Sequence, residues 1–370
     1  MVAARYLARM KNLHMTVLLL FVAILLPGCQ THEHVVLVSV QEDAAESPIQ
    51  FVSKSTRSAA NALLAAMTDE QKKLAQYDIK APLRKDWHFI PRERKGLPFG
   101  DMTNEQKTLV HKLMQTALSD SGYLKATDVI WLESVLYELS NQRPMRSPNN
   151  YVIQIYGDPA DEKAAWGWRL EGHHLSINLT YTSEGIGLTP LFYGTNPAVV
   201  QQGPLAGKRV LADPHNLAVE FAKSLSEEQL KKMMLDQKPR DVVTAPGREA
   251  SLKDPVGLSV ESLNDEQVTI LIDLINSYVF DFEADHAMKL DDYFWDWEDE
   301  DDVVLRDNIH LAWAGPADVD EPFYYRIHTP EIVIEYSCQG KNHVHAVIHD
   351  LTDPLQEDLL KKHFEQHEHE

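Results

Sequence analysis

The chain has 370 residues, 44% of them hydrophobic, which is enough for one large domain or two ordinary domains with a substantial core. Its 56 acidic residues outnumber the 35 basic ones and give a formal charge of −21. This charge argues against nucleic-acid backbones and anionic lipid surfaces as main partners. No second run of about 18 apolar residues follows the N-terminus, so no further membrane span is expected.

The first 28 residues have the layout of a lipoprotein signal peptide. Three basic residues precede an apolar run over residues 17–26, and the motif LPGC at 26–29 resembles a lipobox. The resemblance implies a diacylglyceryl group on Cys29, which would anchor the mature chain in the membrane. Gln30 follows the cysteine, which by analogy favours the outer membrane of a cell envelope, with the protein facing the periplasm. An ordinary cleaved secretory signal is the alternative.

Helical periodicity begins near Ser58, after a mixed, polar stretch at 29–57 that we interpret as a tether. One local pattern then occurs four times: Thr, Ser or Asn is followed three residues later by Gln, with an apolar residue just before. This is a capping box, in which the first side chain accepts a hydrogen bond from a free backbone N–H and the Gln side chain reaches back. It predicts four helix starts, at Thr68, Thr103, Ser226 and Asn264.

Residues 152–181 resemble residues 309–338 at a constant shift of 157. Aromatic and apolar positions agree, and Arg169 falls on Arg326. Further upstream, a shift of 161 places the second capping box on the fourth. We interpret these matches as an internal duplication, in which a helix, an antiparallel meander and a closing helix occur twice. Chance similarity between two ordinary meanders is the alternative.

Alternation of apolar and polar residues predicts eight strands, four in each half, and the short turns between them predict antiparallel pairing. The predicted strands are YVIQIYG, WGWRL, HHLSINLTY and GLTPLFYG, followed by NIHLAWAG, FYYRIH, EIVIEYS and HVHAVIH. The closing helices are expected to begin near Asp213-Pro214 and Asp353-Pro354, because proline suits the first helical turn.

The expected fold class is therefore α+β, with two pseudo-repeated halves that are each an antiparallel meander flanked by helices. They form a single domain over residues 58–370, divided at about 58–235 and 258–370, with 236–257 as the connection. The acidic stretch at 291–302 is a candidate calcium site, but it lacks EF-hand spacing. We therefore favour a solvated acidic loop there.

Several stretches together resemble a known family, the "domain of unknown function 3500" proteins of bacteria and fungi. The stretches are WHFIPRERKGLPFGDMTNEQK, WGWRLEGHHLSINLTY, YGTNPAVVQQGPLAGKRVL, FYYRIHTPEIVIEY and NHVHAVIHD. The resemblance covers about residues 58–365. It implies one domain, often exported, and no established reaction.

Histidines in two predicted strands are candidate metal ligands. Every second residue of HVHAVIH shares one face, so His343 and His345 lie about 7 Å apart and can reach one ion. His174 is expected to point to the same polar side and Glu335 to add a carboxylate, whereas His173 is expected to be a hydrogen-bonded core residue. Such a set suits a divalent metal: zinc, iron or manganese. Histidines that only face water or bond to neighbouring strands are the alternative.

Three further residues are candidates for the chemistry of such a centre. Glu171 is a candidate for moving a proton beside the metal. Arg169 and Arg326 are candidates for binding a substrate carboxylate or phosphate, although bracing of the sheet is the alternative that we favour. Cys338 is the only cysteine besides Cys29, so lipidation of Cys29 leaves it without a disulfide partner, and we expect a structural role.

Two functions follow from these patterns. The first is a membrane-anchored, metal-dependent enzyme, hydrolytic or oxidative, that acts on a small molecule. The second is a non-catalytic binding or envelope-assembly lipoprotein. They differ in one geometric requirement, which is that imidazoles from two separate strands converge on a common point.

Overall fold

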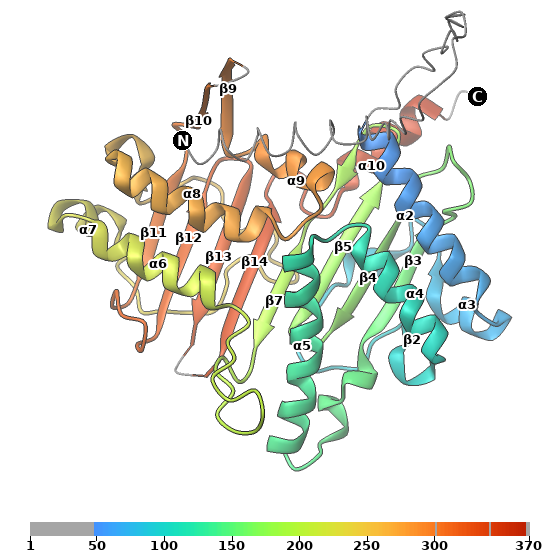
Figure 1. Ribbon diagram of the computed structural model, residues 1–370. Coiled ribbons are helices and arrows are strands. Elements are labelled where there is room, and N and C mark those ends of the chain that lie inside the picture. The colour runs from blue at the N-terminus through green and yellow to red at the C-terminus, as the bar shows by residue number, and fades with distance from the viewer. Residues whose placement is uncertain (1–47, 300–301, 340–341, 368–370) are drawn as a thin grey trace, which may run out of the picture.

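A single large sheet forms the centre of the protein (Figure 1). The structure is a computed structural model that describes residues 48–299, 302–339 and 342–367. The strands of the sheet in the first half are β1 (Gln76–Tyr77), β2 (Leu97–Pro98), β3 (Val152–Gly157), β4 (Trp166–Gly172), β5 (Leu175–Tyr181), β6 (Ile186–Gly187) and β7 (Leu191–Thr195). Those in the second half are β8 (Leu258–Ser259), β11 (His310–Ala314), β12 (Phe323–His328), β13 (Ile332–Cys338) and β14 (Val344–Asp350). The order is β1-β3-β4-β5-β7-β14-β13-β12-β11-β8, with β2 beside β3 and β6 beside β5. The two halves therefore join where β7 pairs with β14.

Helices cover one face of this sheet (Figure 1). The first half carries α2 (Pro48–Ala65), α3 (Asp69–Ala75), α4 (Asn104–Gln115) and α5 (Asp120–Leu139), and the second half carries α6 (Ala212–Ser224), α7 (Glu227–Met233), α8 (Asp265–Val279) and α9 (Ala284–Asp291). The last helix is α10 (Glu357–His367). Apolar side chains of the helices and of one strand face form the main core, because both surfaces lose their contact with water there.

The opposite face of the sheet carries many polar side chains beside a smaller apolar cluster that includes Phe192 and Val347, and it is also buried. Along β13, Ile332, Ile334 and Tyr336 belong to the main core, and the alternate residues Glu335 and Ser337 point to the other side. Two irregular segments, around residues 83–96 and 240–249, lie on that side and hydrogen bond to its polar groups. This second layer explains why every residue of β13 is buried.

The α+β class is confirmed, and each of the eight predicted strands contributes to the sheet by antiparallel pairing. Two boundaries differ from expectation. Helix α2 begins at Pro48, inside the expected tether, where Arg57 donates to the carbonyls of Asp161 and Ala164 and ties the helix down. Helix α10 begins at Glu357 rather than at Pro354, because the carboxylate of Asp353 accepts hydrogen bonds from the next turn of backbone.

The acidic stretch at 291–302 is not a loop. Half of its residues belong to the strands of a separate hairpin, β9 (Trp295–Asp299) and β10 (Asp302–Leu305) (Figure 1). Alternate tryptophans and pairing with Val303 and Val304 favour extended backbone there. Among the described residues, the groups with converging metal-ligand atoms include no member of this hairpin.

All four predicted capping boxes are present, and they interact in pairs. In the first half, the side chains of Gln71 and Gln106 hydrogen bond to each other, and Gln106 also donates to the carbonyl of Ala66. In the second half, Gln229 and Gln267 form the same reciprocal pair. Each pair joins the starts of two helices, so a local capping signal also acts as a tertiary contact.

Strand registers of the two halves also correspond. Arg169 pairs with Asn178, and 157 residues later Arg326 pairs with Glu335. The strand that precedes each arginine departs from the shift of 157 by one residue. Gln154 faces Arg169 in the first half. In the second half Ala312, which lies 158 positions after Gln154, faces Arg326. A duplication would produce these matches, but duplication itself remains a prediction.

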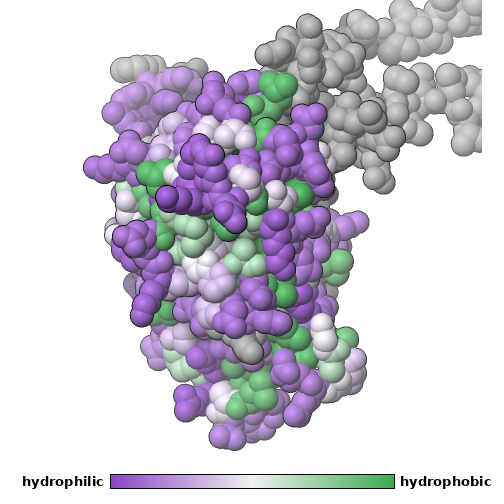
Figure 2. Space-filling view, turned by 90° about the vertical axis from the view of Figure 1, so that its left-hand side faces the viewer, coloured by the Kyte–Doolittle hydropathy of each residue, from purple (hydrophilic) through white to green (hydrophobic). Residues whose placement is uncertain are grey.

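The signal peptide, Cys29 and most of the expected tether lie outside the described residues. Within the described ranges, none of the helices combines the length and the apolar character that crossing a membrane requires. The side of the molecule at the β8 end of the sheet is largely hydrophilic, with apolar residues scattered across it (Figure 2). Such scattered apolar residues are ordinary for a folded domain.

Replacement of the buried Gln106 by alanine is expected to lower the free energy of unfolding by about 1–3 kcal/mol, because it leaves the backbone N–H of Thr103 and the carbonyl of Ala66 without their partner. Gln115→Ala removes an exposed side chain from the same helix and should change stability by less than about 0.5 kcal/mol. Chemical denaturation of both variants measures the difference. Equal losses would show that the glutamine pair contributes nothing specific.

Candidate metal centre

His173 and His174 form the two-residue turn of the hairpin between β4 and β5. Gly172 pairs with Leu175, so the two histidines lie outside the ladder, and the expectation of a strand through both is wrong. His174 has a φ of 66°, the left-handed conformation that a tight turn requires. Its backbone N–H donates to the carbonyl of Phe89 and its carbonyl accepts from Gly194. Contacts on both sides therefore hold this strained residue in place.

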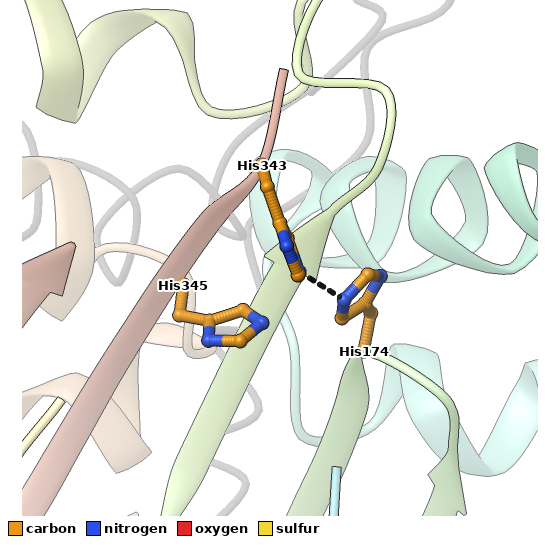
Figure 3. A group of neighbouring side chains, drawn as sticks. All are labelled: His174, His343 and His345. Atoms are coloured by element: carbon orange, nitrogen blue, oxygen red, sulfur yellow. Dashed lines mark hydrogen bonds between the residues drawn. The ribbon is translucent and has the colours of Figure 1, made fainter. Parts of the chain in front are cut away.

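The imidazoles of His174, His343 and His345 converge at the junction of the two halves (Figure 3). His343 immediately precedes β14, His345 lies in it, and His174 comes from the turn before β5, so β7 runs between the contributing strands. One ligand nitrogen from each ring lies within 4.8 Å of the other two. Nε2 of His174 is 2.9 Å from Nε2 of His343. Imidazoles from separate segments of the sheet therefore converge on a common point, which is the geometric requirement stated in the sequence analysis.

Gly194 of β7 makes room for the rings. It pairs with His345 across the sheet and donates its N–H to His174. A Cβ atom at position 194 would lie 2.7 Å from Cδ2 of His174 and 3.0 Å from Cδ2 of His345. Two imidazoles can lie over this strand only because position 194 has no side chain.

His345 is oriented as metal-bound histidines usually are. Its Nδ1 lies 2.7 Å from a carboxylate oxygen of Asp241, so Nδ1–H donates and Nε2 is left with its lone pair. That Nε2 is buried and has no hydrogen-bond partner in the described part of the chain. A buried acceptor without a partner costs stability unless something binds to it. An ion that binds here would take up this lone pair.

Burial keeps the imidazoles of His174 and His343 neutral, the form that binds a metal. Desolvation lowers the pKa of His343 to about 4 and that of His174 well below its usual value. Zinc bound tetrahedrally at 2.0–2.1 Å would need the two Nε2 atoms roughly 3.3 Å apart, a few tenths of an ångström more than they are. The donor set therefore fits a small divalent ion after a slight opening of the rings.

A second group with converging ligand atoms contains Glu133, His173 and His174. Here both ring nitrogens of His173 are engaged, because Nδ1 bonds to Glu133 at 2.7 Å and Nε2 lies 2.8 Å from Nη1 of Arg146. The other carboxylate oxygen of Glu133 is buried without a partner among the described residues. The guanidinium of Arg146, however, repels a cation at this place. His173 is thus the hydrogen-bonded core residue that was expected, and burial lowers its pKa to about 2.

Glu171, a candidate for proton transfer, is instead part of a buried ion pair. Its carboxylate bonds to Nε of Arg94 at 2.7 Å and to the backbone N–H of His88 at 2.8 Å. Arg94 also donates to the carbonyls of Ile90 and Gly172. These bonds hold the segment that carries Phe89 against the hairpin turn. Glu171 therefore supports the turn that carries His174 and does not contact the converging imidazoles.

The other candidates are also engaged away from the histidines. Arg169 bonds to Asn178 and to the carbonyls of Leu83 and Arg84, which gives it a bracing role. Glu335 accepts from the backbone N–H groups of Val243 and Thr244 and from the hydroxyl of Tyr324, and it is outside both converging groups.

Arg326 lies opposite Glu335 and is buried. Its Nε has no hydrogen-bond partner in the ranges that the structure covers. It does not belong to the converging groups either.

Four residues that the sequence interpretation did not single out complete the surroundings: Gly194, Asp241, Glu133 and Arg146. Each lies at least 20 residues along the chain from the histidine that it contacts. Only Gly194 carried a local signal, as a glycine at the end of a predicted strand, and a strand glycine often marks close approach of another group.

Gly194→Ala is expected to displace the rings of His174 and His345 and so abolish stoichiometric metal binding, while the fold is retained. Gly100→Ala is the control, since its Cβ would come no closer than 3.3 Å to Asn149. Zinc content per chain and the circular dichroism spectrum of each variant measure the two effects. Unchanged zinc affinity in Gly194→Ala would contradict the role given to this strand.

Comparisons with known proteins identify the family of the chain. A search of curated proteins and a search of solved structures gave no match. The family model described as "Protein of unknown function (DUF3500)" matches residues 50–353, which include both halves of the sheet and all three converging histidines. The chain therefore belongs to the DUF3500 family.

Proposed function

We propose that the protein is a membrane-anchored, zinc-dependent hydrolase of the cell envelope, with His174, His343 and His345 as the metal ligands. The observation that carries the proposal is the buried, unpartnered Nε2 of His345, aimed at two other neutral imidazoles and oriented by Asp241. Three histidines leave one coordination position for water, and zinc lowers the pKa of such water to about 7, which makes it a nucleophile at neutral pH.

The donor set favours zinc over iron. Non-haem iron enzymes commonly use two histidines and one carboxylate. Here Asp241 bonds to Nδ1 of His345 and Glu335 to a backbone loop, while Glu133 bonds to His173 through one of its two oxygens. A set of three imidazoles supports hydrolytic chemistry more than oxidative chemistry.

The residues of the chain divide the work of the centre. Asp241 fixes the orientation of the His345 ring, Gly194 leaves space for the rings, and the pair Arg94–Glu171 fixes the turn that presents His174. His343 is partly exposed, whereas His174 and His345 are buried. A substrate would therefore approach from the side of His343.

Purified protein is expected to contain about one zinc per chain, and His345→Ala to lose it. Asp241→Asn keeps all three imidazoles and should weaken zinc affinity about 10–100-fold. His310→Ala is the control, because His310 bonds only to the carbonyl of Asn308 in the described structure. Mass-spectrometric metal analysis and zinc titration followed by calorimetry measure these effects.

Hydrolysis of activated esters and phosphoesters by the same variants then tests catalysis. Loss of turnover in His345→Ala but not in His310→Ala supports the enzyme. Absence of zinc, together with a melting temperature that a chelator does not change, would contradict the metal centre and leave the non-catalytic binding lipoprotein.

Membrane attachment rests on the LPGC motif at residues 26–29. Cys29→Ser should move the protein from the membrane fraction to the soluble fraction, since it removes the thiol that carries the lipid. Cys338→Ala, which removes the other cysteine, should leave it in the membrane fraction. Fractionation and metabolic labelling with a fatty acid provide the measurement, and a Cys29→Ser protein that still sediments with membranes would exclude a lipid anchor at this residue.

A further inference from the structure

Arg146 lies beside the metal centre in a short helix, η3 (Pro144–Arg146), between α5 and β3. Two prolines, at 144 and 148, restrict this connection, and Asn150 donates to the carbonyl of Pro144 and closes it. The side chain of Arg146 is half-buried. The conformation of this connection therefore holds the guanidinium of Arg146 at the end of the sheet where the three histidines converge.

His173 orients this guanidinium. Nη1 of Arg146 lies 2.8 Å from Nε2 and 3.0 Å from Nδ1 of His173. Because Nδ1–H of His173 donates to Glu133, Nε2 is the nitrogen that can accept from Arg146. The ring of His173 stacks on that of His174, with 3.6 Å between ring centroids. His173 is therefore the only residue between Arg146 and the candidate ligand His174 along this chain of contacts. Only one nitrogen of the five-donor fork of Arg146 is used in its contact with His173.

No carboxylate of the described residues lies within ion-pair distance of Arg146. Arg146 interacts electrostatically with the buried carboxyl of Glu133, but it forms no ion pair with it among the described residues, so its guanidinium can still attract an anion. Its remaining donors match the two oxygens of a carboxylate or phosphate.

We infer that Arg146 binds an oxyanion group of the substrate, so that the proposed hydrolase acts on molecules with a carboxylate or phosphate next to the bond that is cleaved. This inference rests on the proposed function. Arg146 is a specificity-determining residue in it, since it would hold the anionic group while the bond beside that group lies at the metal.

Inorganic phosphate and acetate are suitable probes, titrated into zinc-loaded and metal-free protein and followed by calorimetry and by the Hε1 resonances of the histidines. Arg146→Gln should weaken binding of the preferred anion about tenfold or more, the usual effect of one charge-assisted hydrogen bond, and leave the zinc content unchanged. Arg146→Lys keeps the charge but loses the planar guanidinium, so its anion affinity should lie between that of the unchanged protein and that of Arg146→Gln. Arg143→Gln, an exposed arginine in the same connection, is the matched control.

The outcomes separate this inference from the proposed function. Tighter binding of phosphate than of acetate assigns the substrate to phosphate-bearing molecules, and the reverse assigns it to carboxylates. Equal anion affinities of Arg146→Gln and Arg143→Gln overturn the inference, even where zinc is bound. Absence of zinc overturns the hydrolase, and the anion titrations of the metal-free variants then decide the role of Arg146 by the same comparison.

Discussion

Pairing of β7 with β14 is the constraint on which the candidate site depends. It joins two half-sheets into one, and its register places Gly194 opposite His345 and Thr195 opposite Val344. A shift by one residue would turn the histidines of β14 to the helix-covered face and place apolar side chains over Gly194. Because Leu191 and Tyr193 of β7 and Ala346 and Ile348 of β14 already lie in the main core, the hydrophobic effect favours the register that the site requires.

A second, electrostatic constraint acts from below the turn. The Arg94–Glu171 pair is almost completely buried, with 3% and 1% of the side chains exposed. Burial of two charges is expensive, and it is tolerated here because both groups are saturated with hydrogen bonds. Removal of one partner from such a pair typically costs about 3–5 kcal/mol. This arrangement stabilises a loop–hairpin contact that neither segment would form by itself.

Local patterns in the sequence predicted local structure well. Capping boxes begin all four expected helices, and alternation in β14 placed His343 and His345 on one face, because both signals depend on neighbours within a few residues. The prediction of a strand through His173 and His174 was wrong because a two-residue turn without glycine has no strong sequence signature. Partners such as Asp241 and Glu133 depend on contacts 40 to 104 residues apart, which alternation and spacing do not encode. Glu335 shows the same limit, since a distant loop takes up its oxygens.

The junction between the halves has a consequence for biosynthesis. During translation β7 is complete at Thr195, but the strand that covers its outer edge begins only at Val344. Until then the nascent chain presents a row of unsatisfied N–H and C=O groups beside apolar side chains, which is a template for pairing with other chains. The interval in which this protein is most exposed to aggregation therefore lies between the synthesis of these two strands, and a chain that ends prematurely within it would keep that edge open.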